Sequence, residues 1–230
     1  MKEDNNLVKY KDLLSINSYN EDTNKEIFVF LPEDGDGVVG RYIGNLNMLE
    51  HGNKIPVRKM IYEKLKEIDK NLKAINPNYS LLVIYGYRTL ENQTKYFNEE
   101  YNKAKNMFDN ELDLLEHVHE KIAVPSVSGH PTGGAVDICI YDNLKKEILD
   151  FGSDIHDFNT EKCFVFSTGI SDIAKENRML LRKLMLEQSF APYNGEWWHF
   201  SYGDKEWAFY YKKSEALYNQ VNSSIVFENN

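Results

Sequence analysis

The sequence predicts an α+β fold: a single compact domain in which helices flank a central, mostly antiparallel sheet. Apolar residues recur at helical spacing in several segments, other short apolar segments have the length of strands, and a turn joins two of these as a hairpin. Because the strands follow one another through hairpins as well as helices, helices packed on an antiparallel sheet fit better than a parallel sheet. The 230 residues are enough for one such domain with a sizeable core.

The first part of the chain contains two predicted strands and one helix. Residues 1–52 are polar and turn-rich apart from a strand candidate at 26–31, and we expect them to form an N-terminal extension packed on the domain. From Pro56, apolar residues fall at steps of three and four, which predicts an amphipathic helix with proline at its start. The unbroken apolar run Leu81–Tyr85 predicts a buried strand that delivers Arg88 beyond its end.

The rest of the chain alternates between helices and short strands. Thr89 can cap a helix that runs, with a break, towards Glu120. We expect the main domain to span residues 53–221 and residues 222–230 to be a frayed tail. Within these bounds the patterns predict strands over 135–140 and near 147–149, a helix over about 172–188, an aromatic strand over 196–202 and a last helix over about 205–221.

Composition and charge exclude several classes of function. The net charge of -9 argues against nucleic acid or an anionic membrane as the main partner. No apolar stretch approaches the roughly 18 residues of a membrane span, and no secretory signal is visible, so the sequence predicts a cytoplasmic protein. Cys139 and Cys163 can form one disulfide, but two reduced thiols fit that compartment better.

Two short motifs contain the residues of a predicted catalytic zinc site. His130 and Asp137 are seven residues apart across a Gly-Gly turn, which lets a loop ligand fold back onto a strand ligand. His199 ends a Glu-Trp-Trp-His motif that begins with Glu196. A catalytic zinc site takes three such protein ligands and keeps a fourth position for water, with a base nearby. We therefore predict one Zn²⁺ per chain at the sheet, held by His130, Asp137 and His199.

Each of these residues also has an ordinary structural interpretation. Taken alone, His130 is a turn residue and Asp137 an acid on an edge strand, although a carboxylate on a buried strand needs a partner that a metal supplies. For Glu196 the alternative is a surface carboxylate. On a regular strand the side chains of Glu196 and His199 point to opposite faces, so the strand must be bulged or twisted for both to reach one metal. The other histidines are expected at the surface: His51, His117, His119 and His156.

Arg88 is the remaining candidate. A guanidinium at the end of a buried strand is costly unless it meets an anion. A developing oxyanion or a substrate carboxylate would supply this anion. The alternative is that Arg88 forms a structural ion pair within the protein.

The motif Ser-x-His-x-x-Gly-x-Ala-x-Asp over residues 128–137, Glu-x-x-His over 196–199 and Tyr-Arg at 87–88 together resemble the zinc D-Ala-D-Ala dipeptidase and carboxypeptidase family. The resemblance runs from about residue 57 to 210. It implies a small α+β domain with a central antiparallel sheet. It also implies zinc on His130, Asp137 and His199, Glu196 as catalytic base, Arg88 as stabiliser of the transition state, and Ser128 in the wall of the substrate pocket.

The details of the resemblance favour the dipeptidase branch, with two departures. Residues 177–185 and the Glu-Trp-Trp-His-Phe motif are closest to dipeptidases, whereas Gly-Tyr-Arg at 86–88 is closer to carboxypeptidases. Tyr87 is thereby a candidate substrate-binding residue. The acid that receives the substrate amine in dipeptidases has no clear counterpart, which leaves Asp154 and Asp157 as candidates.

The resemblance implies hydrolysis of the D-Ala-D-Ala dipeptide to two D-alanines, with water activated by zinc and Glu196. The first alternative is a D,D-carboxypeptidase that removes terminal D-Ala from short peptidoglycan-derived peptides. The second is a zinc-stabilised binding module without catalysis. Glu196 and Arg88 speak against the second, because a structural zinc site closes its fourth position and needs no base.

Overall fold

A computed structural model describes residues 7–18, 27–44, 47–158 and 160–228. In this part of the chain six strands form the central sheet: β2 (Val39–Gly40), β4 (Tyr79–Tyr85), β5 (Ala135–Asp142), β6 (Glu147–Ile148), β7 (Ala191–Pro192) and β8 (His199–Ser201). The strand order is β2-β4-β5-β8-β7, and β6 pairs with one end of β5. Only β2 and β4 are parallel, so the predicted α+β fold with a mostly antiparallel sheet is confirmed.

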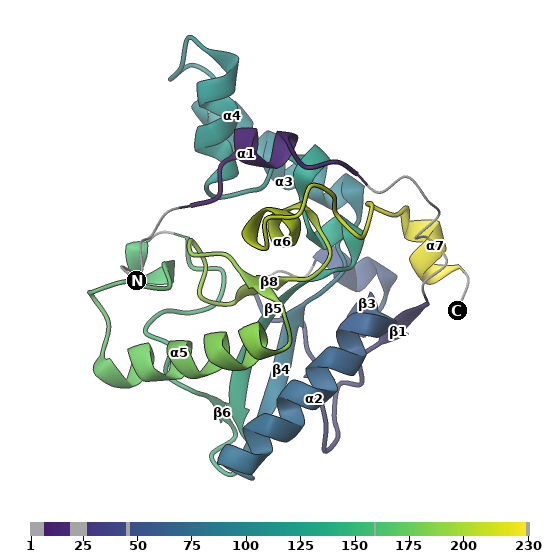
Figure 1. The fold of residues 1–230 in the computed structure, drawn as a ribbon, viewed down its shortest axis with the longest axis vertical. Coiled ribbons are helices and arrows are strands. Elements are labelled where there is room, and N and C mark those ends of the chain that lie inside the picture. Colours follow the sequence, from purple (N-terminus) through teal and green to yellow (C-terminus); the bar gives the residue numbers. More distant parts are fainter. Residues whose placement is uncertain (1–6, 19–26, 45–46, 159, 229–230) are drawn as a thin grey trace.

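The helices pack around this sheet (Figure 1). Helices α2 and α5 contact each other and cross at an angle in front of the sheet in this view, while α1, α3 and α4 group together in its upper part. The α-helices are α1 (Tyr10–Leu14), α2 (Lys59–Ile75), α3 (Leu90–Ala104), α4 (Glu111–His119), α5 (Asp172–Glu187), α6 (Lys205–Tyr210) and α7 (Ser223–Phe227). Short 3-10 helices are η2 (Asn47–His51), η3 (Pro125–Val127), η4 (His130–Thr132) and η5 (Glu161–Cys163). None of the described helices is both long and apolar enough to cross a bilayer.

Most predicted elements are present, and the exceptions have physical causes. The helix predicted from Pro56 begins only at Lys59, because Pro56–Arg58 form β3 and pair with β1 (Phe28–Phe30). The last predicted helix was too long, since α6 ends at Tyr210 and Lys212 adopts a left-handed backbone with φ of 53°.

Described residues near both ends of the chain form regular structure or contribute to the core. Within the predicted tail, Ser223–Phe227 form α7, because Val226 is fully buried against Tyr87 and other residues of a mostly aromatic cluster. Residues 1–52 include β2 and supply Leu31 and Val39 to the main core. The boundary at residue 52 stays a prediction.

The register of the sheet brings chemically important residues opposite one another. On β5, Asp137 pairs with His199 on β8 and with Tyr85 on β4. Residues directly opposite in an antiparallel pair have Cβ atoms roughly 5 Å apart. Two of the three predicted metal ligands therefore meet through backbone pairing alone.

A buried arginine fixes the loop between β6 and α5. Arg178 on α5 is 1% exposed and donates hydrogen bonds of 2.6 Å each to the carbonyl oxygens of Phe151, Lys162 and Phe164. Burial lowers the pKa of Arg178 to about 10, which leaves it charged at neutral pH. These bonds join Phe151 to Lys162 and Phe164 through one side chain and so hold two separate stretches of the loop together.

Substitution of Arg178 by Met is expected to lower the free energy of unfolding by about 3–5 kcal/mol, because three buried carbonyls lose their donor. In a protein of this size that corresponds to a fall in melting temperature of roughly 10 °C. Lys183→Met on the exposed side of the same helix is the matched control and should change little, since its side chain is 70% exposed. Equal melting temperatures for the two variants would refute the role of Arg178.

Candidate functional site: a metal centre in a polar pocket

The structure brings His130, Asp137 and His199 together as a buried group whose ligand atoms all lie within 4.8 Å of one another. Asp137 Oδ1 is 3.0 Å from His199 Nδ1 and 3.5 Å from His130 Nε2. Ligand atoms around a tetrahedral zinc ion with bonds of 2.0–2.2 Å stand about 3.3–3.6 Å apart. These two separations are close to that spacing, and the nitrogen and oxygen donors are those that zinc accepts. The residues present therefore fit a zinc ion.

His130 is held with one ring nitrogen facing the other ligands. It begins η4, and its Nδ1–H donates to the carbonyl oxygen of Gly86 at 2.7 Å, which leaves Nε2 for a metal. The turn that follows ends at Gly133, whose φ of 74° is left-handed and whose added Cβ would meet the Phe28 ring at 2.4 Å. Burial lowers the pKa of His130 to about 4, so the ring is neutral, as a metal ligand must be.

One proton lies between Asp137 and His199, held on His199 Nδ1 and donated to Asp137 Oδ1. Burial lowers the pKa of His199, but the hydrogen bond to Asp137 and the nearby Glu206 carboxylate outweigh it and raise that pKa to about 10. Burial opposes ionisation of Asp137, yet the surrounding histidines hold its pKa well below the ordinary value. A divalent cation would take the place of this shared proton.

Glu196 reaches the same pocket through a turn rather than a strand. The predicted strand over 196–202 was too long, because β8 starts only at His199 and the backbone N–H of His199 donates to the Glu196 carbonyl at 3.2 Å. This turn removes the strand geometry that would separate the two side chains, and both line one cavity. Burial, with a contribution from Asp137, raises the pKa of Glu196 to about 7.

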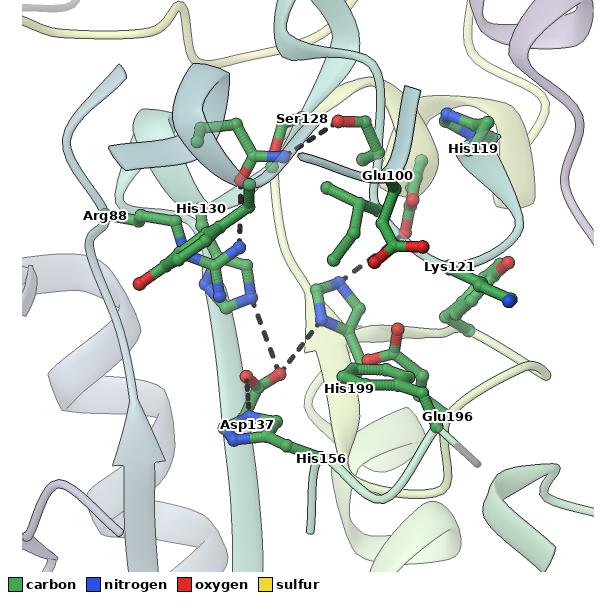
Figure 2. A pocket seen from close by; sticks show the side chains of 18 of the residues that line it. Arg88, Glu100, His119, Lys121, Ser128, His130, Asp137, His156, Glu196 and His199 are labelled. Atoms are coloured by element: carbon green, nitrogen blue, oxygen red, sulfur yellow. Dashed lines mark hydrogen bonds and ion pairs between the residues drawn. The ribbon is translucent and has the colours of Figure 1, made fainter. Parts of the chain in front are cut away.

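Arg88 lies on the opposite side of the triad from Glu196 (Figure 2). Its Nη1–H donates to Gln93 Oε1 at 2.9 Å, and its guanidinium lies over the Tyr85 and Tyr96 rings at 4.5 and 5.3 Å. Gln93 is itself buried and donates to the carbonyl oxygen of Ala123 at 2.7 Å. The guanidinium is thus fixed at the pocket without a carboxylate partner in the described hydrogen bonds, which leaves its charge for a ligand.

The cavity around these groups has a volume of about 180 Å³. Ser128 is buried in its wall. Three other candidates lie elsewhere. Tyr87 is fully buried and donates to the Val221 carbonyl oxygen at 2.8 Å, and Asp154 and Asp157 line a separate cavity.

The structure adds residues that the sequence did not single out. His119 and His156 line the cavity, although both were expected at the surface. His156 Nε2 is 2.8 Å from Asp137 Oδ2, and the dashed lines of Figure 2 converge on Asp137 from three histidines. Glu206 is 3.6 Å from His199 Nε2, and burial raises its pKa to about 7. No local motif marks these residues, because their loops and helices meet the site only in the folded chain.

The chain is similar to curated proteins and to solved structures. D-alanyl-D-alanine dipeptidase of Enterococcus faecalis is 29% identical over 157 residues, 66% of this chain and 76% of that protein. The D-alanyl-D-alanine dipeptidase of Enterococcus faecium is 31% identical over 136 residues, 57% of this chain and 66% of that protein. A solved structure of a variant of the vancomycin resistance D,D-pentapeptidase VanY in complex with Zn(II) aligns with a TM-score of 0.40 and 20% identity, over 82% of this chain and 91% of that one.

Residues 37–221 match peptidase family M15, described as D-Ala-D-Ala dipeptidase. That match spans the central sheet, the triad, Glu196 and Arg88, and it starts before the predicted boundary at residue 52. The chain belongs to the D-Ala-D-Ala dipeptidase family of peptidases, M15.

Proposed function

We propose that this peptidase hydrolyses the D-Ala-D-Ala dipeptide to two D-alanines with one zinc ion held by His130, Asp137 and His199. One observation carries the proposal: a buried His-Asp-His group shares its cavity with a carboxylate of raised pKa and with a fixed guanidinium. The names of the curated relatives supply the substrate class.

Zinc bound at this group would polarise the scissile carbonyl and lower the pKa of a water molecule in the site. Glu196 accepts a proton from the attacking water and passes it to the leaving amine. Burial raises the pKa of Glu196 above the ordinary carboxyl value, and this favours both transfers, because a base near the working pH can take up a proton and give it back. The Arg88 guanidinium stabilises the negative charge that develops on the carbonyl oxygen.

The size of the cavity favours a small substrate. Pockets for drug-sized ligands measure about 300–1,000 Å³, whereas this one measures about 180 Å³. The carboxylates that line it besides Asp137 and Glu196 are Glu99, Glu100 and Glu206. The ammonium group of a dipeptide would meet one of these, in place of Asp154 or Asp157.

The alternative is a D,D-carboxypeptidase acting on longer peptidoglycan-derived peptides. Acetylation of the amine separates the two activities, because a strict dipeptidase refuses acetylated D-Ala-D-Ala. We expect D-alanine release from the free dipeptide and little from the acetylated one. Equal release of D-alanine from the two substrates would exclude a strict dipeptidase and favour the carboxypeptidase.

Substitution of Arg88 by Lys is expected to lower kcat/KM by about 10²–10³-fold with zinc content unchanged, because the compact ammonium loses the bond to Gln93 and the position over the two tyrosine rings. Arg41→Lys is the matched control, since Arg41 lies on the surface and pairs with Asp34. Steady-state kinetics on D-Ala-D-Ala with metal analysis of each protein measures the effect. An Arg88 variant with normal kcat/KM would exclude a role in the transition state.

A further inference from the structure

One contact to the triad comes from a residue outside both sequence motifs. His156 lies in the loop between β6 and α5, and its Nε2 is 2.8 Å from Asp137 Oδ2. The other carboxylate oxygen, Oδ1, faces His130 and His199. The two oxygens of Asp137 thus have separate partners, one on the metal-binding side and one away from it.

We propose that His156 is a positioning residue that makes Asp137 bind zinc through Oδ1 alone. The inference rests on the proposed function, since it concerns the same zinc ion. A carboxylate can bind a cation through one or both oxygens. A hydrogen bond from His156 Nε2–H occupies Oδ2 and so disfavours the second mode. One-oxygen binding limits the protein ligands to three donor atoms, and the fourth position stays open for the reaction.

His156 is not a ligand itself. Among the described residues, the group whose donor atoms lie within 4.8 Å of one another contains His130, Asp137 and His199 but not His156. Its Nδ1 is buried and has no hydrogen-bond partner in the described part of the chain. A buried ring nitrogen without a proton tolerates the lack of a partner better than a buried N–H does. The ring proton is therefore on Nε2, towards Asp137.

The loop holds the His156 ring in place with a strained backbone at this residue. His156 has a φ of 64°, in the left-handed region that residues other than glycine rarely adopt. Such a conformation persists where the surroundings impose it. The ring packs edge-on against Trp198 and Tyr85, at centroid distances of 5.8 and 6.1 Å, and stacks on Phe158 at 6.2 Å. On either side, Arg178 ties down the loop as described above.

Two substitutions separate the hydrogen bond from the packing. His156→Phe keeps an aromatic ring but has no N–H, whereas His156→Gln restores an N–H near the position of Nε2. His117→Phe is the matched control, because His117 is a half-buried histidine on α4 that does not line the cavity. All three full-length proteins are first compared by melting temperature without metal, which reports on folding alone.

Zinc affinity is then measured by competition with a chromogenic chelator, and coordination by the visible absorption of the Co²⁺-substituted proteins. We expect His156→Phe to raise the zinc Kd by about 10–100-fold and to weaken the Co²⁺ bands, since a fifth donor lowers their intensity. His156→Gln should recover most of both properties, and the control should match the wild type.

Three results would overturn the positioning role: wild-type zinc affinity and Co²⁺ spectrum in His156→Phe, equal losses in the Phe and Gln variants, or a loss that follows the metal-free melting temperature. Failure of the proposed function is distinguishable, because the wild-type protein would then bind no zinc or release no D-alanine. A wild type that does both beside an unaffected Phe variant refutes only the inference on His156.

Discussion

Replacement of Glu196 by Gln is expected to lower kcat on D-Ala-D-Ala by about 10²–10⁴-fold while zinc content stays at one per chain. The amide has nearly the shape of the carboxylate, but it cannot accept the proton of the attacking water. Glu196 is not a member of the group of ligand atoms, so the metal keeps all its protein donors. Kinetics and metal analysis on the same preparation test both halves of this expectation.

The control is Glu187→Gln, a carboxylate near the end of α5 that lies outside the cavity. This change should leave kcat and zinc content as in the wild type. Normal turnover by the Glu196 variant would exclude Glu196 as the base, and loss of zinc from it would assign Glu196 to the ligands instead.

The pH dependence follows from the same carboxylate. Burial raises the pKa of Glu196 to about 7 in the absence of metal, and the charge of a bound cation lowers it from there. Because only the ionised form accepts a proton, kcat/KM should fall as the pH drops, with an apparent pKa between the ordinary carboxyl value of about 4.3 and about 7. A wild-type profile that stays flat down to about pH 4 would contradict the assignment.

The second large effect is expected at Asp137. Asp137→Ala should weaken zinc binding by more than the roughly 100-fold typical of residues that only orient a ligand, and activity should disappear at stoichiometric zinc. Asp137 is the residue on which three histidines converge, and its removal takes away the only charged donor of the triad. Without it the pKa of His199 also falls, because its strongest supporting hydrogen bond is lost.

Chelator competition gives the zinc Kd of this variant, and Asp172→Ala serves as the control, since that side chain is 91% exposed on α5. A protein that lacks the Asp137 carboxylate and yet retains wild-type zinc affinity would show that the metal binds elsewhere.

The parts of the site that could be predicted from sequence are those fixed by short-range structure. His130 and Asp137 are joined by one turn and one strand, so their spacing alone indicates that both can face one point. The alternation along β5 was also readable, and it predicted the strand on which Asp137 lies. His199 was recognised from its motif, and its place beside Asp137 depends on the β5–β8 register that only the structure shows.

The errors arose where tertiary structure overrides local pattern. Val57 begins the helical spacing of apolar residues, yet residues 56–58 pair with β1, and the helix begins only at Lys59. The aromatic run after Glu196 suggested a strand, but its first residues form a turn. Tyr87 was a candidate substrate-binding residue because it belongs to the Gly-Tyr-Arg motif. The structure places it in a buried cluster, since neighbours in an extended segment point in opposite directions.

Long-range contacts explain what was missed altogether. His156 and Glu206 come from a loop and a helix that contact Asp137 and His199 only after folding. His156 lies between Asp154 and Asp157 in the sequence, and a histidine with acids so close to it has the sequence features of a surface residue. Its burial depends on Tyr85, Phe158 and Trp198, two of which belong to other segments of the chain.

The release of D-alanine from D-Ala-D-Ala by the full chain tests zinc-dependent dipeptide hydrolysis most directly. It should be measured in the protein as purified, after removal of metal by a chelator, and after zinc is added back. We predict release that chelation abolishes and zinc restores. No release from a protein shown to contain stoichiometric zinc would contradict dipeptidase activity and point to a longer peptide substrate or to a zinc-stabilised binding module.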